Sequence, residues 1–314
     1  MIRKLVALIC FAWITAAPAS AQTVFEGARL ITGEAGAPIE DAAFLVEGTA
    51  FTRVGRRGEI PLPDGASRVD LAGKTVMPAI INAHGHLGYR RGKSFTAENY
   101  TRENIIDHLQ RFAYHGVAAV MSMGAERAEG FALRDELRAR PLPDTALFLT
   151  AGRGIAMPGG GPAPPLRDAP YGVSTEAEAR QAVRELQARK IDRYVKIWVD
   201  DRGGTVEKLP PALYAAAIDE AHKLGLLTVT HTFELEDVKG IMRAGIDGLA
   251  HPPWRSGKAV DEETRKAVFD AGTYVCVYGQ ILQVGIMYMR AAAAFWRGET
   301  KELEAPNFAQ WPTT

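Results

Sequence analysis

Cysteine is scarce in this chain of 314 residues, which contains only Cys10 and Cys276. Cys10 lies in an N-terminal segment that we expect to be removed, so no disulfide can form within the mature chain. The 293 residues that would remain after removal of residues 1–21 (314 − 21) must then be held together by a hydrophobic core. A chain of that length can bury a large one.

The sequence also lacks an excess of charge of either sign, with 37 Lys and Arg residues against 37 Asp and Glu. Loss of Arg3 and Lys4 with the N-terminal segment changes the balance to 35 against 37, a net charge of −2. This balance implies no polyanion-binding face, so we expect no nucleic-acid partner. The 47% hydrophobic and 24% charged residues exclude a disordered or multi-span membrane protein.

An apolar run at residues 5–17 is too short to span a bilayer. Arg3 and Lys4 precede the run, and Ala19-Ser20-Ala21 follows it. This order of basic, apolar and small residues is typical of a secretory signal peptide; the alternative is a first core helix. The sequence therefore predicts a signal at residues 1–21, a periplasmic or secreted protein, and no membrane association of the mature form.

The remainder of the chain changes character near residue 75. Residues 23–74 contain short β-rich pieces separated by Gly, Pro and Asp, which predicts a small antiparallel unit, a β-sandwich, at residues 22–75. From residue 76 onwards, short apolar runs alternate with amphipathic segments, a pattern typical of parallel strands joined by helices. Seven runs are predicted to be strands: 76–82, 117–123, 146–151, 194–199, 226–232, 248–250 and 273–278.

The helices between these runs have recognisable ends. Thr175 and Glu178 form a predicted capping box at the start of one helix. Three further helices are predicted to end just before a glycine suited to a left-handed conformation: 211–224, 236–244 and 261–271. A last helix is predicted at residues 286–296.

The density of strand and helix units over residues 76–314 predicts a (β/α) TIM-type barrel, which typically has eight strands and about 250 residues. No eighth strand is apparent, because residues 297–314 are polar and contain Pro306 and Pro312. We therefore expect an incomplete, seven-stranded barrel.

The connection at residues 157–172 contains five Pro and four Gly residues, which excludes a helix or an inner strand. It is either a loop that covers the substrate or a plain surface excursion.

Histidines lie where several predicted strands end. His84 and His86 close the first barrel strand and point to the same side, because side chains alternate along a strand. His231 and His251 end the fifth and sixth strands. Each histidine alone is compatible with an ordinary rim position, but together they converge on one mouth, where neutral imidazoles suit zinc-like ions.

Lys196 lies on the fourth strand, on the face opposite to Val195 and Ile197. Both faces of a barrel strand are covered, so the amine is expected to be buried, and burial favours its neutral form. A neutral amine can react with carbon dioxide to give a carbamate, which can bridge two cations. The alternative is an amine that reaches the rim and pairs with Asp200 or Asp201.

These motifs resemble the amidohydrolase superfamily, in particular its prolidase-like and imidazolonepropionase-related members. Residues 76–86 are similar to the first-strand motif of the family, with Ala79 in place of a Gly and Asn82 in place of an Asp. The resemblance implies that His84 and His86 bind one divalent metal, that His231 and His251 bind another, and that carbamylated Lys196 bridges them. It implies up to two ions, zinc in the first place, with carbon dioxide needed for the carbamate, and a metal-activated hydroxide that attacks a carbonyl.

One residue of the family pattern is absent. The family places an Asp at the end of strand eight as a metal ligand and general base, whereas the last aspartate here is Asp270, before the seventh strand. No residue can therefore be nominated as the general base. We expect a truncated product or a fragment of a longer enzyme, or else a shorter member completed by a partner chain, so a homo-oligomer is possible.

The sequence supports two hypotheses about the function. The first is a metal-dependent amidohydrolase that cleaves amide, peptide-like or cyclic amide C–N bonds in a small-molecule or dipeptide-like substrate. The second is a non-catalytic remnant of such an enzyme, with or without metal binding through Lys196, His231 and His251. A metal-free phosphate-binding barrel is a distant third option, since only the isolated Gly279 and Gly285 follow the seventh strand.

Overall fold

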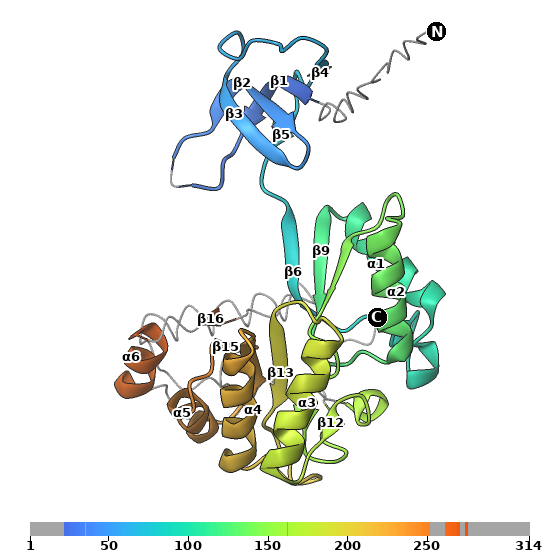
Figure 1. Ribbon diagram of the computed structural model, residues 1–314, viewed down its shortest axis with the longest axis vertical. Coiled ribbons are helices and arrows are strands. Elements are labelled where there is room, and N and C mark those ends of the chain that lie inside the picture. Colours follow the sequence, from blue (N-terminus) through green and yellow to red (C-terminus); the bar gives the residue numbers. More distant parts are fainter. Residues whose placement is uncertain (1–21, 35, 162, 252–260, 271–273, 276–314) are drawn as a thin grey trace, which may run out of the picture. The chain divides into compact units, whose positions relative to one another are not determined.

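The computed structural model describes residues 22–34, 36–161, 163–251, 261–270 and 274–275 (Figure 1). The chain divides into two compact units, one that ends at Pro78 and one that begins at Ala79. The predictions on the signal segment, on Cys276 and on the chain after it lie outside the described residues. No helix within the described ranges has the length and apolar character needed to cross a membrane.

The first unit is a single five-stranded sheet of mixed direction. β1 pairs antiparallel with β2, and β2 with β3, whereas β4 and β5 both run parallel to β1. The expectation of a purely antiparallel unit is therefore wrong, and a two-layer sandwich remains a prediction. The strands are β1 (Gln22–Leu30), β2 (Ile39–Glu47), β3 (Ala50–Arg56), β4 (Ser67–Asp70) and β5 (Thr75–Val76).

Both faces of this sheet are covered at β2. Neighbouring residues of a strand point to opposite faces, and Leu45 packs with Val24 and Ile60 while Phe44 packs with Leu30. The sequence prediction also misplaced Val76, which belongs to β5 and pairs with Leu30 of β1 rather than with the strand that follows. Pro78 separates the two, because proline cannot donate a hydrogen bond to a sheet.

Two parallel sheets lie in the second unit, as the sequence predicts for an α/β fold. One has the strand order β10-β9-β6, and the other the order β12-β11-β13-β14-β15-β16. Each of the seven apolar runs overlaps a strand, and closure into a barrel remains a prediction. The strands are β6 (Ile80–Gly85), β9 (Val117–Ser122), β10 (Leu147–Thr150), β11 (Ile155–Ala156), β12 (Tyr171–Gly172), β13 (Tyr194–Trp198), β14 (Leu227–His231), β15 (Gly248–Leu249) and β16 (Tyr274–Val275), with a small hairpin of β7 (Arg90–Arg91) and β8 (Ser94–Phe95).

The helices connect consecutive parallel strands, and α3 lies beside α4 (Figure 1). The capping box of Thr175 and Glu178 is present, and Gly225 and Gly245 have φ values of 71° and 88° after α4 and α5. These three predictions are confirmed. The helices are α1 (Arg102–Tyr114), α2 (Ala128–Ala139), α3 (Glu176–Ala188), α4 (Pro211–Lys223), α5 (Leu235–Arg243) and α6 (Glu262–Asp270).

The apolar faces of these helices form the main core against the sheet. Ala179, Val183 and Leu186 of α3 are fully buried and pack in one cluster with Val195 and Ile197 of β13. Fully burying a Val, Leu or Ile side chain contributes about 1.5–3 kcal/mol. Because Val195 and Ile197 face the helices, the alternate residues of β13 must face the opposite side of the sheet.

The glycine- and proline-rich connection is largely irregular, as its composition predicts. Its described residues, 157–161 and 163–172, contain one 3-10 turn, η2 (Pro164–Leu166), and the short edge strand β12. Arg153 holds its far end by donating to the carbonyl groups of Ala169 at 2.7 Å and Pro170 at 3.1 Å. The near end is held at Gly160, whose carbonyl accepts from Arg202 at 3.3 Å.

Candidate metal centre

The first pair of predicted site residues lies at the end of β6. The rings of His84 and His86 are 5.3 Å apart at their centroids, which places both imidazoles on one side of the strand. Gly85 lies between them, and a Cβ there would come within 3.1 Å of Val120 on the neighbouring strand β9. His84 Nδ1 lies 3.3 Å from the carbonyl oxygen of Ala250, next to His251.

Lys196 is fully buried on β13, as the sequence predicts. Its Nζ lies 4.7 Å from the centroid of the Trp198 ring, because residues two apart on a strand share a face. Trp198 is paired in register with His231 of β14. The indole ring lies 5.8 Å from the ring of His86 and 5.1 Å from that of His231, so Trp198 links Lys196 to one histidine of each pair.

The second histidine pair is in direct contact. Nε2 of His251 lies 2.8 Å from Nδ1 of His231, and the His84 and His251 rings are 6.4 Å apart at their centroids. Phe233 packs against both His231 and His251, with ring centroids 4.4 Å away in each case. The structure thus brings together all five predicted site residues: His84, His86, Lys196, His231 and His251.

Three of the imidazoles, those of His84, His86 and His251, are held in their neutral form. Burial lowers the pKa of His86 to about 3, with a further contribution from the charge of Lys196. Burial likewise holds the pKa of His84 and of His251 well below the usual value, and Lys196 and the neighbouring histidines add to the effect. Neutral imidazole is the form that binds metal ions.

The donor chemistry of this group fits divalent cations. His86 retains some exposed surface, but its Nδ1 is buried, and neither it nor the buried Nδ1 of His251 has a hydrogen-bond partner among the described residues. Buried polar atoms without partners are costly unless something binds them. Within the same residues, however, no three His, Cys, Asp or Glu side chains are already arranged around a common ion position. The contact between His231 and His251 gives a reason, since two of the ligand-type nitrogens face each other.

Trp198, Phe233, Asp200 and Arg202 were not predicted as members of this site. Trp198 and Phe233 each lie two residues beyond a predicted ligand, so the alternation rule could have identified them. Asp200 was considered only as an alternative partner of Lys196, whereas its carboxylate contacts His231 at 3.2 Å and Arg202 at 2.7 Å.

The remaining histidines lie in the places that the sequence predicts. His108 lies within α1, where its Nε2 is 2.7 Å from the carbonyl oxygen of Arg90, and His115 follows the last residue of that helix. His222 lies in the last turn of α4 and pairs with Asp247 at 2.9 Å. In the described part of the chain, none of these three histidines contacts His84, His86, His231 or His251.

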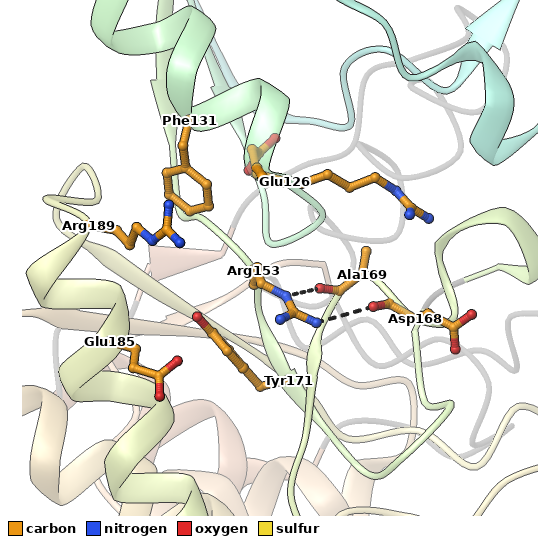
Figure 2. A pocket seen from close by; sticks show the side chains of 10 residues that line it. Glu126, Phe131, Arg153, Asp168, Ala169, Tyr171, Glu185 and Arg189 are labelled. Atoms are coloured by element: carbon orange, nitrogen blue, oxygen red, sulfur yellow. Dashed lines mark hydrogen bonds between the residues drawn. The ribbon is translucent and has the colours of Figure 1, made fainter.

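A separate cavity of about 320 Å³ lies beside α2 and α3, and no residue of the histidine cluster lines it. Figure 2 shows Arg153 at its centre, next to Tyr171, with two hydrogen bonds to the carbonyl groups of Ala169 and Asp168. The guanidinium group lies 4.3 Å from the centroid of the Tyr171 ring. Arg153 thus fixes the end of the glycine- and proline-rich connection.

Comparison with known proteins identifies relatives of this fold. No family model matches the chain. It is 30% identical over 178 residues to an imidazolonepropionase of Cereibacter sphaeroides, which covers 55% of this chain and 39% of that protein. It is 27% identical over 207 residues to an uncharacterized protein of Mycobacterium tuberculosis, covering 64% and 50%. The chain thus spans about half the length of the curated relatives it matches.

Two solved structures are similar over most of the chain. A Xaa-Pro dipeptidase with bound methionine has a TM-score of 0.66 and 22% identity, covering 81% of this chain and 66% of that one. An amidohydrolase has a TM-score of 0.71 and 16% identity, covering 88% and 76%.

The fold is therefore that of the amidohydrolase superfamily, and the resemblance inferred from the motifs is confirmed. The proteins that this chain resembles include imidazolonepropionases by sequence and a Xaa-Pro dipeptidase by structure.

Proposed function

We propose that this protein is a metal-dependent amidohydrolase that cleaves an amide, peptide-like or cyclic amide C–N bond in a small-molecule or dipeptide-like substrate. The observation that carries the proposal is the cluster of four histidines with one fully buried lysine, in which Trp198 contacts His86, His231 and Lys196. The names of the relatives support the reaction class, since they include a dipeptidase and an amidohydrolase.

The residues of the cluster divide naturally between two ions. His84 and His86 would hold one divalent cation, and His231 and His251 a second, with zinc favoured by the four imidazoles. Bound cations of this type supply a hydroxide nucleophile at neutral pH and polarise the carbonyl group that it attacks. Trp198 and Phe233 exclude water from the imidazoles and hold their rings in place.

Lys196 would link the two histidine pairs as a carbamate. In that step the lone pair of the neutral amine attacks the carbon of carbon dioxide and a C–N bond forms. One C=O π bond breaks, its electron pair moves to the oxygen, and one proton passes from the nitrogen to water. Complete burial of Lys196 favours the neutral amine that this reaction needs. Activity that rises with added bicarbonate, and that is lost in Lys196→Ala, is the expected result.

The connection at residues 157–172 would cover the substrate. Arg202 contacts its Gly160 turn and the ring of His231, so the connection is tied to the cluster by one side chain. Arg153 fixes the other end. A loop fixed at both ends can shield a reaction from water without a large closing motion.

A non-catalytic remnant is the second candidate. Two observations favour it: no general base could be nominated from the sequence, and the described residues contain no ready-made three-ligand site. In that case the chain would bind fewer ions and turn over no substrate.

The deciding experiment measures zinc content and hydrolysis together. The purified chain is loaded with zinc and bicarbonate, bound zinc is counted by plasma mass spectrometry, and Xaa-Pro dipeptides, N-acyl amino acids and cyclic amides are tested as substrates. If the protein is a metal-dependent amidohydrolase, we expect about two zinc ions per chain and hydrolysis that a chelator abolishes.

His231→Ala should lower bound zinc and activity together. The control is His222→Ala, which replaces a histidine of α4 paired with Asp247 and should change neither quantity. Zinc content unaffected by His231→Ala would refute the site.

We also propose that the protein is exported. The basic, apolar and small-residue order of residues 1–21 supports the proposal. Amino-terminal sequencing of the protein from a periplasmic fraction should begin at Gln22, and recovery of the intact chain in the cytoplasm would contradict export.

A further inference from the structure

Asp200 connects the histidine cluster to the turn that follows β13. Its side chain is 3% exposed, and Oδ2 lies 3.2 Å from Nε2 of His231 and 2.7 Å from Nη1 of Arg202. Oδ1 accepts from the backbone nitrogen of Arg202 at 3.2 Å. The carboxylate therefore faces the nitrogen of His231 that points away from His251.

Arg202 occupies an unusual backbone conformation in order to reach this place. Its φ is +54°, in the left-handed region that disfavours most side chains, and Gly203 and Gly204 follow it with φ values of 69° and 80°. A strained residue of this kind persists only when its surroundings hold it. The contacts that hold Arg202 include those with Asp200 and with the carbonyl group of Gly160.

The contact between Arg202 and His231 allows two arrangements of protons. Nη1 of Arg202 lies 2.9 Å from Nε2 of His231, and both lie near the same carboxylate oxygen. In the first arrangement both nitrogens donate to Oδ2 of Asp200, and Nδ1 of His231 keeps its lone pair. In the second, Nε2 accepts from Arg202, and the proton lies on Nδ1, opposite His251. Only the first leaves an electron pair on Nδ1 of His231, where it accepts from Nε2 of His251 at 2.8 Å.

We propose that Asp200 is a positioning residue that fixes the proton of His231 on Nε2, and that Arg202 holds the carboxylate in place and couples it to the Gly160 turn. The carboxylate is a much stronger acceptor than a neutral imidazole, so the two donors converge on it. Nδ1 of His231 is then presented, with its lone pair, toward His251. This inference rests on the proposed function, because it describes how a ligand nitrogen is made ready for a cation. Carboxylates that orient a ligating histidine in this way typically change metal affinity 10- to 100-fold.

The test reads the proton position directly. Long-range proton–nitrogen NMR spectra of the metal-free protein with ¹⁵N-histidine report which ring nitrogen carries hydrogen, and His231→Gln identifies the signal. We expect the proton of His231 on Nε2 in the wild type and on Nδ1 in Asp200→Ala, where Arg202 loses its carboxylate. Zinc affinity in Asp200→Ala, measured by competition with a chelator, should fall roughly 10- to 100-fold.

Asp201→Ala is the matched control. Asp201 lies next to Asp200, and its Oδ1 accepts from the backbone nitrogen of Gly203 at 3.0 Å rather than from the cluster. It should keep both the proton position and the zinc affinity of the wild type. Asp200→Asn serves if Asp200→Ala does not fold, since it keeps the volume and weakens the acceptor.

A wild-type proton on Nδ1, or an Asp200 variant with unchanged proton position and zinc affinity, would overturn the proposal. The NMR measurement needs neither zinc nor substrate. A wild type that binds no zinc would therefore refute the proposed function, while the proton position of His231 would still decide the role of Asp200.

Discussion

Gly124 lies directly against the side chain of Lys196. A Cβ at residue 124 would come within 2.7 Å of Cβ and 2.6 Å of Cγ of Lys196, and the φ of Gly124 is +85°. The alkyl stem of the buried lysine is therefore pressed against the backbone that follows β9. This contact fixes the direction in which the amine enters the cluster.

Gly124→Ala should displace Lys196 and weaken zinc binding. The matched control is Gly116→Ala, because Gly116 has a similar φ of +80° and open space where the Cβ would lie. Both variants should lose roughly 1–2 kcal/mol of unfolding free energy to the left-handed conformation. Gly124→Ala should lose more unfolding free energy than Gly116→Ala, as measured by urea unfolding. It should also bind less zinc, as measured by metal content. Equal stability and equal zinc content in the two variants would contradict the contact.

Glu126 should make the protein less stable as the pH rises from 4.5 to about 7. Burial raises the pKa of this carboxyl from its usual 4.5 to about 7, although Ser122 and Thr150 donate hydrogen bonds that lower it. Between pH 4.5 and 7 the folded protein keeps a proton that the unfolded chain has lost. The unfolding free energy therefore falls over this window, by up to about 3 kcal/mol for the difference of about 2.5 units (7 − 4.5).

Urea unfolding at several pH values between 4 and 8 measures this loss. Glu126→Gln cannot titrate, so its stability should fall less steeply over the window, and Glu129→Gln, an exposed position on α2, should keep the slope of the wild type. A wild-type slope in Glu126→Gln would show that other groups cause the pH dependence.

Arg134 should be one of the costliest charged residues to replace. Its side chain is 2% exposed and donates to the carbonyl groups of Arg189 at 2.8 Å and Lys190 at 2.9 Å, just after the end of α3. Carbonyl groups at a helix end have no partner within the helix. Arg134→Met keeps the apolar stem but leaves these groups unpaired, which should cost about 3 kcal/mol.

The control for Arg134 is Arg102→Met, which removes an exposed ion pair with Glu136. Exposed pairs contribute at most about 1 kcal/mol, so this variant should unfold at nearly the wild-type urea concentration. Similar losses in both variants would mean that the buried hydrogen bonds of Arg134 contribute little.

The sequence allowed the five cluster residues to be predicted because each is a polar residue in, or at the end of, an apolar run. Strand periodicity alone places Lys196 on the face opposite to Val195, and the same rule extends to Trp198. The contact of Asp200 with His231 could not be predicted, because it depends on a left-handed turn at Arg202 and on the register of β13 with β14. Local patterns carry no information on such non-local distances.

The fold shows the same division between local and non-local information. The capping box of Thr175 and the glycines after α4 and α5 follow from local chemistry, and their positions were predicted. The parallel pairing of β4 and β5 with β1 joins segments about 40 residues or more apart and has no local signal. Pro78 was available as a sign that Val76 belongs to the first unit, since proline interrupts a strand.

β1, the earliest described strand, lies inside its sheet and not at an edge. It has β2 on one side and β4 and β5 on the other. During synthesis, β1 and β2 can form a hairpin early, but the other edge of β1 stays open until residues 67–76 have left the ribosome. A nick that detaches the segment from Gln22 to Leu30 would therefore remove the middle of the sheet rather than a border strand. Proteolytic trimming at this end should abolish the first unit as a whole.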